Sequence, residues 1–86
     1  MRIYLGTDMD GNVALAYVQG KEMRVVEESK MDDFFEGKVK DLRNVEEIKN
    51  FYSNIEAEDN FYNIDGQEFD TAALDEFENV ELITEL

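Results

Sequence analysis

The first 27 residues contain three short segments with the pattern of β-strands. In residues 2–7, Ile3 and Leu5 share one face, and in residues 13–18 bulky side chains at 13, 15 and 17 alternate with those at 14, 16 and 18. Residues 22–27 form a third extended run. Turn-forming residues separate these segments, at positions 8–12 and 19–20. Short apolar runs joined by tight turns predict three strands in an antiparallel meander.

Two segments further along have the spacing of helices. Apolar residues recur every three or four positions from Lys30 to Glu36 and from Val45 to about Ile55, which predicts two helices. Each begins with a capping pattern, Ser29 with Asp32 and Asn44 with Glu47. Ala14 and Ala16 in the central strand are small, so we expect a helix to pack closely against that face of the sheet.

The last third of the chain predicts a hairpin, a short helix and an edge strand. Asp65-Gly66 suits a two-residue turn in a hairpin spanning residues 61–69. Asp70 is placed to cap a helix from Thr71 to about Glu78. Val80–Thr84 is extended and is expected as an edge strand of the sheet. At that edge Val80–Leu86 could pair with a second copy to form a homodimer.

The apolar residues of the C-terminal half are expected mostly in the core. They are Phe51, Tyr52, Ile55, Phe61, Ile64, Phe69, Leu74, Phe77, Val80 and Leu82. The complete pattern predicts an α+β fold: a small antiparallel β-meander with two to three short helices and a C-terminal hairpin or edge strand. No linker interrupts the chain, so we expect residues 1–86 to form a single domain.

The charge is distributed unevenly along the chain. The formal net charge is -14, from 22 acids and 8 bases. Residues 1–43 carry nine acids and seven bases, whereas residues 44–86 carry thirteen acids and one base, Lys49. From Asn50 to Leu86 there are eleven carboxylates and no base. Such asymmetry indicates an acidic binding half with a basic partner, and it disfavours direct binding to nucleic acid or to an anionic membrane.

Several classes of function lack the residues they need. The chain has no Cys and no His, so disulfides, thiolate zinc sites and histidine-based catalysis are excluded. No phosphate-binding glycine loop is present, and we expect neither an enzyme nor a cofactor. Apolar runs are too short to span a membrane, and the first residues do not form a signal region, which predicts a cytoplasmic protein.

Residues 8–12 deserve comparison with calcium-binding loops. Asp8, Asp10, Gly11 and Asn12 match the start of such a loop, but Gln19 stands where a bidentate Glu is needed, and strands flank the segment. A polar hairpin turn explains the pattern better, and no metal site is predicted. A calcium-binding module remains a third hypothesis.

The acidic surface itself is the candidate site. Phosphates of B-form DNA lie about 6–7 Å apart along each strand, and carboxylates four apart on a helix or two apart on a strand have a comparable separation. Ten carboxylates are therefore predicted to bind the partner: Glu56, Glu58, Asp59, Asp65, Glu68, Asp70, Asp75, Glu76, Glu78 and Glu81. The alternative is a solvated face that keeps a small protein soluble.

The size of the chain, its lack of Cys, its small predicted sheet and its late cluster of acids resemble the phage-encoded nucleic-acid mimics, above all small anti-CRISPR proteins. The ending Val80-Glu81-Leu82-Ile83-Thr84-Glu85-Leu86 is similar in character to that of some type II-A inhibitors. The resemblance implies a stoichiometric inhibitor, in the cytoplasm of a bacterial host cell. It would occupy the nucleic-acid groove of a basic partner, a CRISPR effector or another defence nuclease.

Two hypotheses of different class follow from the acidic half. The first is a DNA-mimic inhibitor of a bacterial defence nuclease. The second is an acidic protein-interaction module, such as an antitoxin or a regulatory subunit that neutralises a basic partner. The genomic neighbourhood separates them: phage genes beside the gene favour the first hypothesis, and a gene for a small basic partner favours the second.

Overall fold

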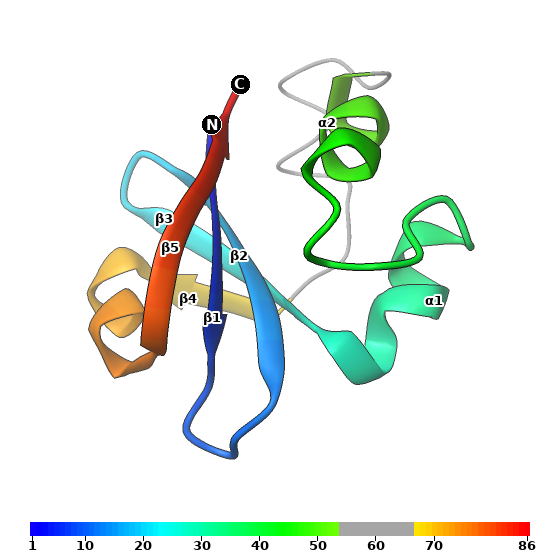
Figure 1. The fold of residues 1–86 in the computed structure, drawn as a ribbon. Coiled ribbons are helices and arrows are strands. Elements are labelled where there is room, and N and C mark those ends of the chain that lie inside the picture. The colour runs from blue at the N-terminus through cyan, green and yellow to red at the C-terminus, as the bar shows by residue number, and fades with distance from the viewer. Residues whose placement is uncertain (54–66) are drawn as a thin grey trace.

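The strands form one antiparallel sheet with the order β4-β3-β2-β1-β5 (Figure 1). The structure is a computed structural model that describes residues 1–53 and 67–86. The strands are β1 (Arg2–Thr7), β2 (Val13–Gln19), β3 (Glu22–Glu27), β4 (Gln67–Asp70) and β5 (Glu78–Glu85). The predicted meander is confirmed, because β2 pairs with both β1 and β3. The predicted edge strand is also confirmed, because β5 pairs with β1 at one side of the sheet.

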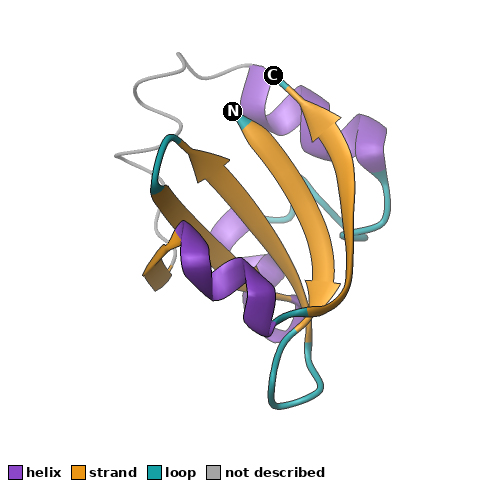
Figure 2. Cartoon of the chain, turned by 90° about the vertical axis from the view of Figure 1, so that its left-hand side faces the viewer, coloured by secondary structure: helices purple, strands orange, loops and turns teal. Residues whose placement is uncertain are grey.

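Each face of the sheet is covered by a different layer (Figure 2). On one face lie α1 (Met31–Phe35) and α2 (Val45–Ser53), which enclose a core with Leu15 and Tyr17 of β2. On the other face lies η2, a 3-10 helix from Thr71 to Glu76. The strand positions in between, Ala14, Ala16 and Val18, are buried beneath η2 and the residues around it. The small side chains of β2 therefore do permit a close helix, as predicted, although it is a 3-10 helix.

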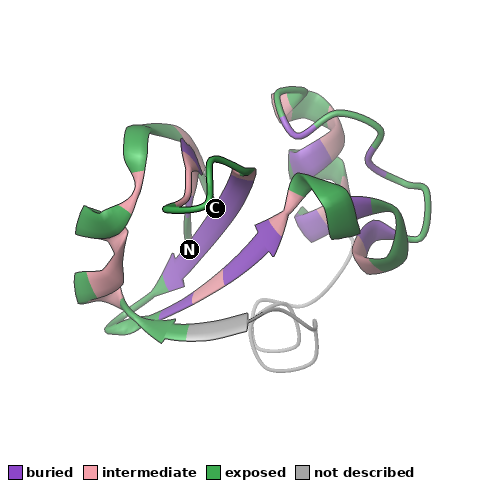
Figure 3. Cartoon of the chain, turned by 90° about the horizontal axis from the view of Figure 1, so that it is seen from below, coloured by how far each residue is buried: buried purple, intermediate pink, exposed green. Residues whose placement is uncertain are grey.

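The core on the α1/α2 side is largely aromatic. The Phe35 ring is fully buried and contacts the Phe34 and Phe51 rings edge-on, at centroid distances of 4.7 and 4.8 Å. Tyr17 lies 5.5 Å from Tyr52 in the same cluster. Burial raises the pKa of the Tyr52 hydroxyl well above its ordinary value, and the nearby Tyr17 adds to the shift. In Figure 3 the buried strands lie between this layer and the more exposed η2 layer.

The capping prediction fails for α1. A 3-10 turn, η1 (Glu28–Lys30), precedes this helix, so Ser29 already lies within a helical turn and Lys30 occupies the N-cap without a side-chain hydrogen bond. The helix ends at Phe35, and Glu36 and Gly37 follow with φ of 53° and 76°.

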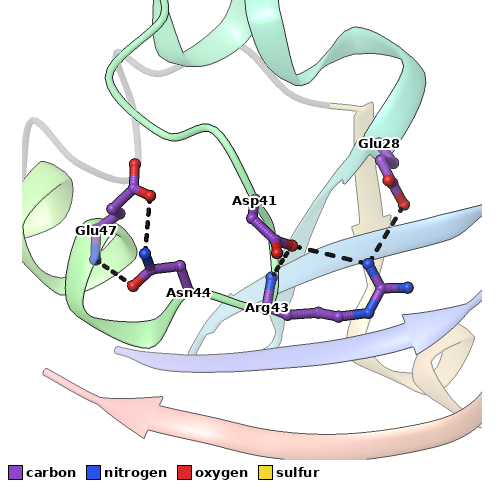
Figure 4. Close-up of polar contacts among 5 residues, drawn as sticks. All are labelled: Glu28, Asp41, Arg43, Asn44 and Glu47. Carbon is purple, nitrogen blue, oxygen red and sulfur yellow. Dashed lines mark hydrogen bonds and ion pairs between the residues drawn. The ribbon is translucent and has the colours of Figure 1, made fainter.

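The other two capping predictions are confirmed. The amide of Asn44 donates to Glu47 Oε1 at 2.8 Å, and the Glu47 backbone N–H donates to Asn44 Oδ1 at 3.3 Å (Figure 4). At the start of η2, Asp70 Oδ1 accepts a hydrogen bond from the Ala72 backbone N–H at 3.0 Å. In both caps a side-chain oxygen accepts from a backbone N–H group of the first helical turn, which has no carbonyl partner within the helix.

The prediction for the C-terminal core is only partly correct. Tyr52 is buried, and Phe51, Leu74 and Phe77 are half-buried. Phe69, Val80 and Leu82 are instead exposed, by 37%, 37% and 48%. They lie on β4 and β5, the two outer strands, and six residues of η2 are too few to cover that whole face. Ile55, Phe61 and Ile64 lie outside the described residues, as does the first half of the predicted hairpin.

Candidate partner-binding surface

Five of the ten predicted site residues can be placed with their side chains. Asp70 ends β4, Asp75 and Glu76 lie on η2, and Glu78 and Glu81 lie on β5. All five are exposed. Four of the others, Glu56, Glu58, Asp59 and Asp65, lie outside the described residues, and of Glu68 only the position in β4 is described.

The five carboxylates form no ion pair with any residue whose side chain the structure describes. In the helical layer, by contrast, Arg43 lies 3.9 Å from Glu28 and 3.7 Å from Asp41 (Figure 4). Those contacts are exposed, so they contribute little stability. Arg2, in contrast, lies on the η2 side of the sheet, 5.9 Å from the centroid of the Tyr4 ring.

The asymmetry of charge along the sequence becomes an asymmetry between the layers. Residues 28–53, which include η1, α1 and α2, carry seven acids and five bases. Residues 69–86, which include η2 and β5, carry six acids and no base. The helical layer is therefore nearly balanced, whereas η2 and the strand that follows it present charge of a single sign.

The acids of η2 do not form the row that an α-helix would give. The segment is a 3-10 helix, in which residues three apart are aligned and the turn contains three residues. Asp75 and Glu76 are successive residues, so their side chains leave the helix in different directions. The spacing of four residues used to compare this segment with phosphates therefore does not apply to η2.

Glu76 instead belongs to a hollow of about 220 Å³ at one end of the sheet. The hollow is lined by Asp8, Met9, Asp10, Val25, Glu27, Phe69, Ala73, Glu76 and Phe77. We call it the acidic hollow, because four of these residues are carboxylates and none is basic. Its other five residues are apolar, so its wall combines negative charge with hydrophobic surface.

Three carboxylates of the acidic hollow were not among the predicted site residues. Asp8 and Asp10 come from the turn between β1 and β2, and Glu27 ends β3. The predicted meander contained the signal that would have found them. In an antiparallel meander the first turn and the end of the third strand lie at the same end of the sheet.

The turn that carries Asp8 has a regular hydrogen-bonded structure. Asp8 Oδ1 accepts hydrogen bonds from the backbone N–H groups of Asp10 and Asn12, at 3.0 and 2.9 Å. Gly11 has a φ of 82°, which glycine adopts readily. This geometry is that of a polar hairpin turn. Within residues 1–53 and 67–86, no group of three or more acidic side chains is arranged to hold a metal ion.

Two further findings concern the chain as a whole. No helix in the described part is long and apolar enough to cross a membrane. No protein-family model matches the sequence, and neither a curated protein nor a solved structure matches it.

Proposed function

We propose that this protein is an acidic DNA-mimic inhibitor that binds the basic nucleic-acid-binding groove of a bacterial defence nuclease, in the manner of anti-CRISPR proteins. One observation carries the proposal. Every carboxylate from Asp70 to Glu85 is exposed, and none is paired with a described cation. In this proposal the partner is a basic protein. The inhibitor acts by occupying the partner's nucleic-acid-binding groove, without catalysis and without a cofactor.

A physical argument supports a binding role for this surface. A net charge of -14 on 86 residues weakens the folded state through self-repulsion. Solubility alone requires far less: a net charge of about 2–8 is adequate for a small domain. A basic partner would relieve the repulsion on binding, and the same charge would accelerate its encounter with the inhibitor.

The scaffold also supports the proposal, because it holds the acids on ordered elements. Asp70 caps η2, and Glu78 and Glu81 belong to a strand paired with β1. Ordered carboxylates lose less conformational freedom on binding than those of a flexible tail. The arginines and lysines of a nucleic-acid groove are already placed to bind anions, so they can accept carboxylates in place of phosphates.

Capture from a lysate tests the proposal. The protein is immobilised, and a lysate of a CRISPR-bearing bacterium is passed over it at about 0.1 M and about 1 M salt, where the Debye length falls from about 10 to about 3 Å. We expect a basic nuclease to be retained at low salt, to be released at high salt and to be displaced by duplex DNA. Retention that is unchanged at high salt, or that DNA cannot displace, contradicts the proposal.

Matched variants locate the surface responsible. One variant combines Asp75→Asn, Glu76→Gln and Glu78→Gln. A control combines Asp32→Asn, Asp33→Asn and Glu46→Gln, which removes the same charge from exposed positions in the helical layer. Loss of capture only in the first variant assigns binding to the η2 side, whereas equal loss in both attributes it to net charge alone.

A second candidate function has a specific observation in its favour. Phe69, Val80 and Leu82 are exposed near the acids. A DNA backbone has no apolar groups of this kind, so DNA mimicry does not explain these side chains. An acidic protein-interaction module, such as an antitoxin or a regulatory subunit, would use such residues at its interface. It would capture a basic protein whose binding is not displaced by DNA.

A further inference from the structure

We propose that the acidic hollow receives an arginine side chain of the partner protein, with the stem and the guanidinium plane on Phe69 and the charge among the rim carboxylates. The inference rests on the proposed function, because it requires a basic protein partner. The inference names the side chain that would bind in the acidic hollow. It also assigns specificity to the apolar wall, which phosphate mimicry does not need.

The apolar part of the hollow presents an aromatic side chain without full cover. Phe69 pairs with Met23 across β4 and β3, which directs it to the η2 face of the sheet. It remains 37% exposed, while Val25 is buried and Ala73 and Phe77 are half-buried. The apolar wall of the hollow therefore includes one exposed aromatic side chain, that of Phe69.

The rim supplies negative charge from three separate elements. Asp8 and Asp10 belong to the β1–β2 turn, Glu27 ends β3, and Glu76 ends η2. Asp8 uses Oδ1 to accept two backbone hydrogen bonds, so it positions the turn. Asp10, Glu27 and Glu76 have no ion-pair partner among the described side chains. These three are the groups that we expect to meet a cation.

Size and chemistry together indicate a single long cationic side chain. Pockets for small-molecule ligands commonly measure about 300–1,000 Å³, and this hollow of about 220 Å³ is smaller. A metal ion would gain nothing from the apolar wall, because Ca²⁺ is bound by six or more oxygen ligands and apolar side chains supply none. Arginine combines an apolar stem, a planar cation that stacks on aromatic rings and several hydrogen-bond donors for carboxylates.

A peptide titration tests the occupant directly. The ¹⁵N-labelled protein is titrated with a capped Gly-Arg-Gly peptide, and the same peptide with lysine or with neutral citrulline serves as the comparison. We expect backbone shifts confined to the acidic hollow, strongest for arginine, weaker for lysine and absent for citrulline. Shifts distributed over all exposed acids, or an equal response to lysine, overturn the inference. Calcium chloride that shifts the same residues also overturns it.

Two pairs of variants separate the wall from the rim. Phe69→Leu keeps an apolar side chain but removes the ring, and we expect about two- to fivefold weaker arginine binding, the range typical of an exposed cation–π contact. Glu76→Gln removes one rim charge and should also weaken binding. Leu82→Ala and Glu81→Gln are the matched controls, since both residues are exposed on β5 and neither lines the hollow. Variants whose effects equal those of the controls contradict the proposal.

The titration and the capture experiment fail independently. If a nuclease is captured but Phe69→Leu and Glu76→Gln leave its affinity unchanged, the inference is wrong and the proposed function stands. If the arginine peptide binds the hollow but no basic protein is captured, the proposed function is wrong and the site is retained.

Discussion

Gly6→Ala should destabilise the protein, because β1 passes close to the segment that joins η2 to β5. A Cβ atom on Gly6 would lie 3.2 Å from Val80 Cγ2, 3.3 Å from the Glu78 carbonyl oxygen and 3.4 Å from Phe77 Cβ. Carbon atoms in favourable contact are about 3.5–4.0 Å apart. The added methyl group would therefore press on three neighbours, and the Glu78 oxygen cannot rotate away because it belongs to the backbone.

Two effects of opposite sign determine the size of the change. Alanine restricts the unfolded chain more than glycine does, which stabilises the folded state by about 0.4–1 kcal/mol where the native backbone suits alanine. The φ of Gly6 is not positive, so this gain applies here. Forcing a methyl group into a packed site costs about 1–3 kcal/mol. We expect the packing cost to dominate, with a net loss of about 1–2 kcal/mol in the free energy of unfolding. In a domain of this size the Tm would fall by about 5–15 °C.

Urea unfolding followed by circular dichroism measures the loss, and a double-mutant cycle tests its cause. Val80→Ala removes the nearest atom, so Gly6→Ala should cost less in that background, with a coupling of about 0.5 kcal/mol or more. Leu82→Ala is the control, because no atom of Leu82 is among the three closest to the new methyl group. A stabilising Gly6→Ala, or equal coupling to Val80 and Leu82, refutes the reasoning.

Three further predictions concern the described core, a helix cap and the net charge. Burial raises the pKa of Tyr52, so the contribution of its neutral hydroxyl to the free energy of unfolding is fully present below about pH 10, the ordinary tyrosine pKa. Above that pH the contribution is lost, at up to about 1.4 kcal/mol per pH unit. The stability of Tyr52→Phe relative to the wild type, measured by urea unfolding, should therefore rise with alkaline pH, and a constant difference would contradict this. Asn44→Ala removes both hydrogen bonds with Glu47 and should lower the free energy of unfolding by about 1 kcal/mol, whereas Asn44→Ser should retain most of it. Because the net charge is -14, added sodium chloride should raise the urea midpoint by screening self-repulsion; a midpoint independent of salt would show that repulsion is negligible.

The sequence was most informative where structure depends on neighbours in the chain. The three early strands could be predicted because alternation reports directly which side chains share a face. The caps at Asn44 and Asp70 form between residues two or three positions apart, and both occur. The same pattern failed at Ser29, because the preceding turn already begins a 3-10 helix. Local chemistry cannot decide between a cap and the interior of an earlier turn.

Burial was harder to predict, because it depends on what covers each face of the sheet. Phe69 and Leu82 are apolar, yet both are exposed. The helical layer fully buries Ile3, Leu15 and Tyr17 on its face of the sheet, whereas a six-residue 3-10 helix covers only the centre of the opposite face. A small domain has too little chain to cover every apolar side chain. Exposure of Phe69 is therefore a consequence of layer size, which no short stretch of sequence reveals.

The candidate site depends on pairings that join distant parts of the chain. After α2 the chain adds β4 to one side of the meander and β5 to the other, with η2 across the face between them. The pairing of Thr7 with Glu78 brings the start of β5 to the end of the sheet that carries the β1–β2 turn. Glu76 consequently shares a hollow with Asp8 and Asp10, although more than sixty positions separate them.

This topology changes what the acidic composition means. A row of carboxylates along one segment would suit any regularly spaced set of cations, including the arginines and lysines that bind a nucleic-acid backbone. Carboxylates gathered from the β1–β2 turn, β3 and η2 around the partly exposed Phe69 are selective in a different way, because they favour a cation that also has apolar surface. Under the proposed function, net charge would govern how fast and from how far a basic partner is attracted, while the hollow would govern which side chain of that partner fits. The two contributions are separable, because salt screens the first strongly and the loss of the Phe69 ring affects only the second.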